Sequence, residues 1–547
     1  MRNLLFIIAI LAFFSCQKPP FYQGTSSEKE FVWQGANIYF LLTDRFYNAD
    51  SLNDVNFERT KIAGKLRGFE GGDLKGITTK IREGYFTKLG INAIWMTPIV
   101  EQIHDATDEG TGITYAYHGY WAKDWTAIDP NFGTKEDLKE LVETAHKNGI
   151  RILLDAVINH TGSVTEIDPV WPSDWVRTSP TCTHKNYENT TSCTLVENLP
   201  DIRTDSNENV KLPLQLVEKW KSEGRYEQEI KELEFFFKRT GYPKAPRFYI
   251  MKWLTDYITE FGIDGYRVDT AKHTEEYVWQ EFKKECDFAF AEFKRNHPKK
   301  VLDDNDFYLV GEVYNYAISN GKTFDFGDKK VNYFDKAFNS LINFEIKWNV
   351  KQLSAKAVFQ KYDSLLNSDL KGFGVLNYMT SHDDGQPFDE KREIPYETAT
   401  MLLLTPGTSQ VYYGDESARS LKIEGTTGDA TLRSMMNWND VNHSAETKKI
   451  LEHWQKLGKF RANHPAVGAG KHSVISEENG LVFSRIYKND KIIIGIDLFE
   501  HAINIDVSSI FKDGEVLKEA YSNQKVTVKN GRINFNSEFS TILLEKN

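Results

Sequence analysis

The sequence lacks a long basic run, an apolar run of membrane-spanning length, and an excess of glycine or proline. Lys and Arg number 67 against 78 Asp and Glu, which gives a formal net charge of −11, and no basic block is long enough to form a phosphate-binding stripe. Nucleic acid is therefore not an expected partner. With 36 Gly, 16 Pro and 40% apolar residues, the chain is neither collagen-like nor largely disordered. Its 547 residues are enough for more than one globular domain.

The only long apolar run lies at the N-terminus. Leu4–Phe14 has eleven residues, too few to span roughly 30 Å of hydrocarbon but typical of the hydrophobic region of a signal peptide. Ser15 and Cys16 follow, and this ending resembles a bacterial lipoprotein signal, whose cysteine is lipidated and becomes the mature N-terminus. Simple cleavage is the alternative. We expect a signal peptide over 1–15, a tether over 16–33, and an exported lipoprotein, periplasmic or attached to the outer membrane through its lipid alone.

The other three cysteines fall into two environments. Cys182 and Cys193 are close in sequence and flanked by polar residues in a region without periodicity. An exported chain meets oxidising conditions, so we expect a disulfide between them, with two free thiols as the alternative. Cys286 lies in an apolar stretch and is expected in the core.

Short apolar runs alternate with longer helical periodicity from residue 34 to about 420, which is typical of repeated βα units and a parallel sheet. Eight such strands with intervening helices predict an α/β fold, a (β/α)₈ TIM barrel, with its active site at the carboxyl ends of the strands. The expected strands are Ile38–Leu42, Ala93–Met96, Ile152–Asp155, Gly265–Val268, Phe307–Val310, Leu341–Phe344, Gly374–Met379 and Gln410–Tyr413.

Two segments do not fit the barrel pattern. The interval between the third and fourth strands is too long for a barrel connection, so residues 160–245 are expected to form a small inserted domain. After about residue 465 the pattern changes to short alternating strands with turn signals, which predicts a C-terminal antiparallel β-sandwich over 465–547. The expected strands there are Leu481–Tyr487, Lys491–Leu498, Val526–Val528 and Ile542–Leu544. The catalytic barrel would then comprise 34–159 and 246–464.

Carboxylates, histidines and one arginine follow the predicted strands. The third strand ends in Asp-Ala-Val-Ile-Asn-His, the fourth contains Gly-Tyr-Arg-Val-Asp, the fifth is followed by Glu and the seventh by Ser-His-Asp. Residues two apart in a strand share a side, so Arg267 and Asp269 point the same way. A cation beside a carboxylate lowers its pKa and holds it ionised, as a nucleophile requires.

Taken in this order, the four segments resemble those of the α-amylase family of glycoside hydrolases, and the resemblance extends from about residue 34 to the C-terminus. One departure is Ser381, where the family usually has Asn before His-Asp. A hydroxyl at that position can still hydrogen-bond locally.

The resemblance implies a retaining mechanism. Asp269 would attack the anomeric carbon, Glu312 would act as acid and then base, and Asp383 would bind the 2- and 3-hydroxyls of the sugar. Other residues would bind substrate, with the Tyr stacking on the sugar at the cleaved bond and Arg267 orienting the nucleophile. They are Tyr120, Trp121, His160, Arg267, Lys272, His273 and His382.

The same resemblance implies Ca²⁺ as a cofactor. Asn159, Asp201 and the main-chain carbonyl of His273 match the family's calcium ligands between barrel and inserted segment, and hard oxygen ligands suit this ion. A neutral hydrogen-bond network is the alternative. A second group resembles a calcium site found in some members, with ordinary turns as the alternative. Its residues are Asn48, Asp50, Asn53, Asp54, Gly71 and Asp73.

The expected function is that of an endo-acting, monomeric α-amylase that hydrolyses α-1,4 bonds of starch or maltodextrin. Rivals on the same scaffold are a maltogenic or cyclodextrin-hydrolysing enzyme, an exo-acting α-glucosidase, a transglycosylase, and a non-catalytic glucan-binding protein. Aromatic residues make up 13% of the chain. Some of their rings would cover the apolar faces of glucose, but most are expected in the core.

Overall fold

The computed structural model describes residues 30–108 and 110–547. The predicted signal peptide, the lipidation site at Cys16 and most of the predicted tether lie outside the described residues. Within the described part, no helix combines the length and the apolar character needed to cross a membrane.

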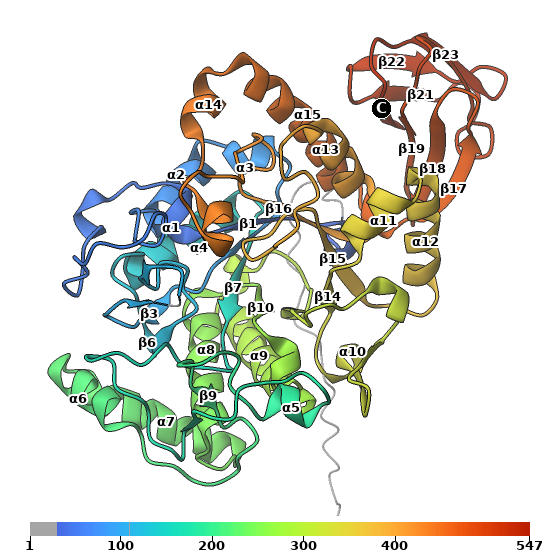
Figure 1. Cartoon of the computed structure of the whole chain (residues 1–547). Helices are drawn as coiled ribbons and strands as arrows, with labels where there is room; N and C mark the ends of the chain where they lie inside the picture. The colour runs from blue at the N-terminus through green and yellow to red at the C-terminus, as the bar shows by residue number, and fades with distance from the viewer. Residues whose placement is uncertain (1–29, 109) are drawn as a thin grey trace, which may run out of the picture.

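Eight parallel strands close into a barrel, as predicted (Figure 1). Each lies within two residues of its expected bounds, because strands buried on both faces are near-continuous apolar runs that stand out in a sequence. In order around the barrel they are β1 (Asn37–Leu41), β2 (Ala93–Met96), β7 (Arg151–Ala156), β10 (Gly265–Val268), β11 (Tyr308–Gly311), β14 (Ser340–Asn343), β15 (Gly374–Tyr378) and β16 (Thr408–Tyr412).

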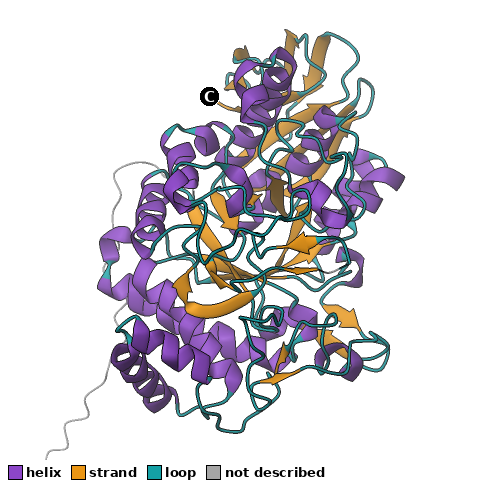
Figure 2. Ribbon diagram, turned by 60° about the vertical axis from the view of Figure 1, so that its left-hand side comes forward, coloured by secondary structure: helices purple, strands orange, loops and turns teal. Residues whose placement is uncertain are grey.

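Helices surround the barrel (Figure 2). The best marked in sequence is α4, which begins after Thr134 in a capping box with Asp137 and is followed by Gly149 at a φ of 71°. The longer helices are α2 (Leu74–Arg82), α4 (Lys135–Lys147), α8 (Pro246–Phe261), α9 (Glu276–Asn296), α12 (Ala355–Asn367), α13 (Pro395–Leu404) and α15 (Ala445–Asn463). The shorter ones are α1 (Thr43–Phe46), α3 (Tyr85–Lys88), α10 (Tyr333–Lys336), α11 (Ile346–Gln352), α14 (Trp438–His443) and α16 (Ala466–Ala469).

The chain between β7 and α8 makes a long excursion at one side of the barrel (Figure 1). Its elements are β8 (Val176–Arg177), α5 (Glu188–Thr191), β9 (Asp201–Ile202), α6 (Leu214–Ser222) and α7 (Tyr226–Thr240). The disulfide between Cys182 and Cys193 closes a loop within it, and Cys286 is buried, so both cysteine predictions are confirmed. Three small two-stranded antiparallel sheets lie in the barrel loops: β3 (Val100–Gln102) with β6 (Ala122–Ile128), β4 (Thr107–Asp108) with β5 (Ile113–Thr114), and β12 (Thr323–Asp325) with β13 (Lys330–Asn332).

The C-terminal segment forms two antiparallel sheets that share one core, which confirms the predicted sandwich (Figures 1 and 2). Ile493 and Leu544 of the larger sheet are buried in one apolar cluster with Ile503 and Ile533 of the smaller sheet. The larger sheet contains β17 (Lys471–Ser476), β18 (Leu481–Tyr487), β19 (Asp490–Ile496), β24 (Ile542–Lys546), β21 (Val516–Glu519) and β22 (Gln524–Thr527), and the smaller one β20 (Ala502–Asp506) and β23 (Arg532–Asn536).

Candidate active site

Arg267 lies at the centre of the carboxylates at the carboxyl ends of the barrel strands. The parallel register sets it opposite Asp155 of the neighbouring strand, and its side chain shares a face with Asp269. Its Nη1 donates to both oxygens of Asp155 at 3.0 Å and to Oδ1 of Asp269 at 2.7 Å. Its Nη2 lies 2.8 Å from Oε2 of Glu312. One buried guanidinium therefore holds three carboxylates from three strands.

The backbone fixes the two proposed reacting groups. The amide of Asp269 donates to the carbonyl of Ala156 at 3.0 Å. The amide of Thr270 donates to Oε2 of Glu312 at 2.8 Å, and Thr270 adopts a φ of 47°, which is unfavourable for a β-branched residue. Such backbone strain is typical of functional sites, and here it aims an N–H at Glu312.

Burial controls the protonation of this cluster. It raises the pKa of Glu312 to about 8; Arg267 opposes the rise, whereas the charges of Asp269 and Asp383 add to it. Burial likewise raises the pKa of Asp155 to about 7, again against the effect of Arg267. Three buried acids share one cation, so the cluster retains a proton near neutral pH. Glu312, with the higher pKa, is the group suited to donate it.

Aromatic and imidazole rings line the same place. The hydroxyl of Tyr120 donates to Oδ2 of Asp155 at 2.9 Å, and its ring stacks on that of His382 with centroids 5.3 Å apart. The Nε2 of His160 donates to the carbonyl of Tyr120 at 3.1 Å. Burial lowers the pKa of both histidines, so they are neutral hydrogen-bonding groups near pH 7.

The loop after β15 carries the third predicted carboxylate. Asp383 is exposed, with Oδ1 3.7 Å from Nδ1 of His382. The Oγ of Ser381 lies 3.3 Å from the same nitrogen, so the hydroxyl at this position does hydrogen-bond locally, as expected. The next residue, Asp384, is buried and accepts from Nζ of Lys347 at 2.5 Å through both oxygens. Asp383 thus projects from a loop anchored by its neighbours.

Three predicted substrate-binding residues lie outside the hydrogen-bonded cluster of carboxylates. Trp121 is 4% exposed and packs in a small apolar cluster, so a direct sugar contact from it stays a prediction. The Nζ of Lys272 is 3.4 Å from the carbonyl of Tyr314 and 4.9 Å from the centre of its ring, at the partly open side. The Nδ1 of His273 donates to the carbonyl of Thr190 at 3.0 Å and ties the barrel to the excursion.

Sequence reasoning missed three functional positions. Asp155 is the first residue of the Asp-x-x-x-Asn-His segment, so its place at a strand end was the available signal. Asp384 directly follows Asp383, but nothing local indicated that Lys347, on α11, would pair with it.

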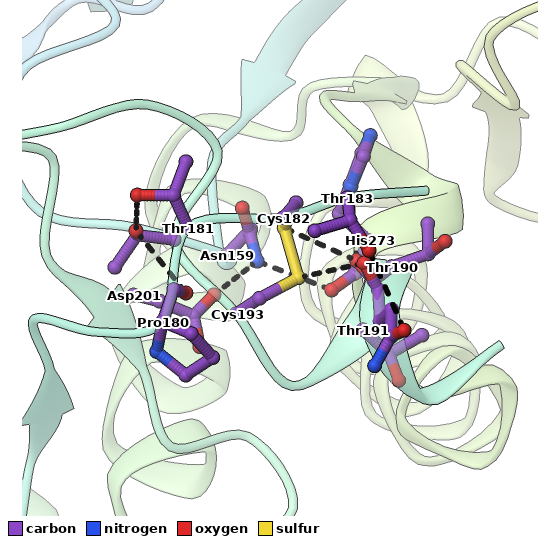
Figure 3. Close-up of a disulfide and its surroundings, with 12 residues drawn as sticks. Asn159, Pro180, Thr181, Cys182, Thr183, Thr190, Thr191, Cys193, Asp201 and His273 are labelled. Carbon is purple, nitrogen blue, oxygen red and sulfur yellow. Dashed lines mark hydrogen bonds between the residues drawn. A yellow bond between two sulfur atoms is a disulfide. The ribbon is translucent and has the colours of Figure 1, made fainter. Parts of the chain in front are cut away.

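The first predicted metal ligands do meet, beside the disulfide (Figure 3). The Nδ2 of Asn159 donates to Oδ1 of Asp201 at 2.7 Å and to the carbonyl of His273 at 3.3 Å. If the side-chain amide of Asn159 rotates by half a turn, its oxygen takes the place of its nitrogen and faces the oxygens of Asp201 and His273. Three oxygens of this kind suit Ca²⁺. However, Nε of Arg177 lies 3.0 Å from Oδ2 of Asp201, the one carboxylate among these ligands, and Arg177 also pairs with Asp205. A cation at this point would therefore lie close to a buried guanidinium.

The second predicted group fits a cation better. The Nδ2 of Asn48 donates to Oδ1 of Asp54 at 2.9 Å, and a Cβ on Gly71 would come within 2.3 Å of that nitrogen. The Oδ1 of Asn53 is buried without a hydrogen-bond partner. Asp73 accepts from the amide of Asp50 at 2.8 Å, which keeps those two carboxylates adjacent. In the described part of the chain, no three His, Cys, Asp or Glu side chains are placed to hold a metal, so amide oxygens would be needed here.

Comparisons with known proteins agree with this arrangement. Residues 40–465 match the family described as "Alpha amylase, catalytic domain". The periplasmic alpha-amylase of Escherichia coli (strain K12) is 34% identical over 86% of this chain and 73% of its own length. The cyclomaltodextrin glucanotransferase of Thermoanaerobacterium thermosulfurigenes is 25% identical over 84% of this chain, which spans 59% of that protein.

A solved structure has the same fold. The alpha-amylase of Anoxybacillus superposes with a TM-score of 0.65 over 95% of this chain and 99% of that one, at 23% identity. The family match covers most of the chain, and the 34% identical relative is covered over more than two thirds of its length. The chain therefore belongs to the α-amylase family of glycoside hydrolases.

Proposed function

We propose that this enzyme is an endo-acting α-amylase that hydrolyses α-1,4-glucosidic bonds of starch and maltodextrins with retention of configuration. The observation that carries the proposal is the shared guanidinium of Arg267, which bonds Asp269 through one nitrogen and Glu312 through the other. A single rigid fork sets the nucleophile and the acid at a fixed separation. Retaining glycosidases need two carboxyl groups about 5–5.5 Å apart.

The two carboxyl groups would divide the work. Asp269, oriented by its hydrogen bond from Arg267, attacks the anomeric carbon, while protonated Glu312 gives its proton to the leaving oxygen as the glycosidic bond breaks. The resulting glycosyl ester is hydrolysed when Glu312 takes a proton from water. Asp383 binds the sugar's vicinal hydroxyls, and His382 hydrogen-bonds to the same sugar. Neutral His160 gives its only N–H to the carbonyl of Tyr120, so it would accept from a sugar hydroxyl through Nδ1.

The names of the relatives support an α-glucan substrate, and they leave more than one activity on it as alternatives. The 34% identical protein is named a periplasmic alpha-amylase, whereas relatives near 25% include a maltogenic alpha-amylase of Bacillus acidopullulyticus and several cyclomaltodextrin glucanotransferases. A maltogenic or cyclodextrin-hydrolysing enzyme, or a transglycosylase, is therefore the alternative. A non-catalytic glucan-binding protein would have no need of the intact trio Asp269, Glu312 and Asp383.

Export is part of the proposal. Leu4–Phe14 has the length of a signal-peptide core, and the 34% identical relative is named a periplasmic alpha-amylase. Ser15 followed by Cys16 supports lipidation of that cysteine, and hence a membrane-anchored monomer facing the periplasm or the outside.

We also propose that the protein binds calcium, and that the two predicted groups of ligands differ in their affinity for it. The group around Asp54 would be the stronger site, since it offers a carboxylate together with the unpartnered Oδ1 of Asn53 and, among the described residues, has no arginine beside its carboxylates. The junction at Asp201 would be weaker, because the guanidinium of Arg177 lies 3.0 Å from its carboxylate and would repel the ion. Calcium would brace loops and take no part in bond cleavage.

The test replaces each reacting carboxyl with its amide. Asp269→Asn and Glu312→Gln should each remove nearly all starch hydrolysis, by roughly a thousandfold or more, while the circular dichroism spectrum is unchanged. A matched control is Glu446→Gln, an exposed glutamate on α15, which should keep full activity. Near-normal turnover by either folded active-site variant would show that the roles are wrongly assigned.

A product time course from amylose and maltoheptaose separates the rivals. Rapid viscosity loss with mixed oligosaccharides is expected for endo attack. Early maltose or glucose alone, or products longer than the maltoheptaose supplied, would instead favour a maltogenic enzyme, an exo-acting enzyme or a transglycosylase.

A further inference from the structure

A cavity of about 470 Å³ lies between the barrel helices and the C-terminal sandwich. It is bounded by the ends of α11 and α12, by α13 and α15, and by the sandwich loops that follow β19 and precede β24. Figure 1 shows α11, α13 and α15 next to the sandwich. None of the proposed catalytic or substrate-binding residues borders it. Its size falls within the range of small-molecule binding pockets.

Two half-exposed aromatic rings border this cavity, one from the barrel and one from the sandwich. Tyr396, on α13, is 45% exposed, and Phe539, in the loop before β24, is 40% exposed. Each partner in the fold therefore supplies one half-covered ring. Large apolar faces left open to water beside a cavity are candidates for contact with a ligand.

Polar groups accompany the rings. Glu397 and Asp497 border the cavity with exposed carboxylates, and Ser540 and Thr400 add hydroxyls. Lys456 contributes one cation at its edge, with Nζ 4.9 Å from the centre of the Phe539 ring. The wall thus alternates apolar faces with hydrogen-bonding groups and carries a net negative charge.

Hydrogen bonds join lining residues of the cavity across the junction between barrel and sandwich. The hydroxyl of Tyr521 and Nδ1 of His453 are 2.7 Å apart, and Nε2 of His453 is 3.1 Å from Oγ1 of Thr400. Tyr521 also meets the Phe539 ring edge-on, with centroids 4.9 Å apart. A hydrogen-bonded chain therefore joins α15 and α13 of the barrel to the sandwich, and it supports Phe539 from behind.

This combination selects the chemistry of the ligand. An anion would meet two carboxylates against one ammonium group, and a purely apolar ligand would strip water from carboxylates without replacing their hydrogen bonds. A neutral polyhydroxylated ring satisfies both requirements, because its C–H faces cover aromatic rings while its hydroxyls donate to carboxylates.

We propose that this cavity is a second carbohydrate site, which holds a segment of α-1,4-glucan away from the catalytic centre. The choice of glucan rests on the proposed function. The site would keep the enzyme on the polymer between cleavages, since tethering raises the effective concentration of chain at the active site. It should therefore matter for granular starch and not for short oligosaccharides.

The binding test uses Glu312→Gln, so that glucan is not consumed. Calorimetry with maltoheptaose should give two sites per chain in this background and one site after Tyr396→Ala and Phe539→Ala are added, with roughly fivefold weaker adsorption to granular starch. The matched control adds Phe235→Ala, a 69% exposed ring on α7, and should keep two sites. Cellohexaose serves as the β-linked probe and should not bind.

The activity test uses the wild-type carboxyls. Tyr396→Ala with Phe539→Ala should lower hydrolysis of granular starch several-fold and leave kcat/KM for maltoheptaose unchanged. Unchanged stoichiometry and starch adsorption in the double variant, or an equal loss in the Phe235→Ala control, would overturn the second site. A wild-type chain inactive on every α-glucan would instead reject the proposed function, and the calorimetric count of sites would still stand by itself.

Discussion

Arg267 contributes more than an ion pair. Its Nη1 reaches Asp155 and Asp269 and its Nη2 reaches Glu312, so every carboxylate of the cluster except exposed Asp383 shares its charge. Removal of such a buried cation would leave several buried acids unpaired, which commonly costs 3–5 kcal/mol. A lysine has one nitrogen and no planar fork, so it could not bond both reacting groups in this geometry.

The raised pKa of Glu312 has a direct kinetic consequence. Its protonated form is the acid, so kcat/KM should fall as pH rises through an apparent pKa near 8. Asp383 contributes to the rise, and Asp383→Asn should therefore move the alkaline limb to lower pH, besides lowering activity. The measurement is the pH profile of kcat/KM on a soluble maltooligosaccharide, normalised for each variant.

Glu446→Gln is the control for this profile, because that exposed side chain lies on α15 and should leave the limb in place. If Asp383→Asn leaves the alkaline limb where it is in the wild-type enzyme, the charge of Asp383 does not reach Glu312, and another group sets the limb.

The sequence predicted part of the cluster around Arg267. The alternation of side chains in a strand was enough to place Arg267 and Asp269 on one face. It could not place Asp155 or Glu312 on the same guanidinium, because those contacts join strands that are distant in sequence and depend on barrel register.

Among the elements, α11 and the loop after β15 are coupled through one buried pair. Lys347 donates from α11 to both oxygens of Asp384 and to the carbonyl of Gln386 at 2.9 Å. Asp383 therefore stands next to a residue that is held by a buried ion pair. The pair is nearly inaccessible to water on both sides, so it cannot be replaced by solvent at low cost.

Lys347→Met should disturb this loop without touching the reacting carboxyls. We expect KM to rise and kcat to fall, together roughly tenfold or more in kcat/KM, because Asp383 loses its position. Lys347→Arg should recover part of the activity. Steady-state kinetics on maltoheptaose, with circular dichroism to check the fold, measures this.

The double variant Lys347→Met with Asp384→Asn separates positioning from stability. It removes the unpaired buried charge, so the free energy of unfolding should recover while kcat/KM stays low. Wild-type kinetics in Lys347→Met would mean that Asp383 is placed by other contacts.

Sequence patterns predicted the elements unevenly. All eight barrel strands were predictable because parallel strands covered on both faces are apolar runs. In the sandwich, β17, β20, β21 and β23 were missed, since their residues alternate between buried and exposed over only four to six positions and carry polar side chains outward. Short, half-exposed strands resemble loops in composition.

In the whole molecule, the sandwich and the excursion are fixed to the barrel by buried cations. Arg485 of β18 donates to the carbonyl of Leu404 at 2.6 Å, at the end of α13. Arg177 of β8 pairs with Asp201, which in turn accepts from Asn159 at the end of β7. A positive side chain thus supplies at the excursion junction part of what a bound metal would supply, and this was not visible from the predicted ligands alone.

The dependence of stability on calcium should therefore arise mainly at the second predicted group, around Asp54. Affinity for Ca²⁺ rises with the negative charge of its ligands, and this group has Asp50, Asp54 and Asp73, with only the half-exposed Lys75 paired to the first. Chelation should lower the thermal unfolding midpoint of the wild-type chain by a few degrees, and Asp54→Ser should abolish most of that drop.

Variants at the junction complete the test. Arg177→Met removes the internal cation, so it should destabilise the calcium-free chain and enlarge the drop on chelation, because Asp201 then gains from the metal what it lost from the arginine. Asp201→Asn should retain the wild-type drop. A drop abolished by Asp201→Asn but kept in Asp54→Ser would reverse this ranking of the sites, and an unchanged midpoint after demonstrated removal of metal would reject calcium at both. The size of the drop in Arg177→Met is decisive. If the junction binds no metal, this variant loses the same stability with and without chelator, and its drop equals that of the wild-type chain.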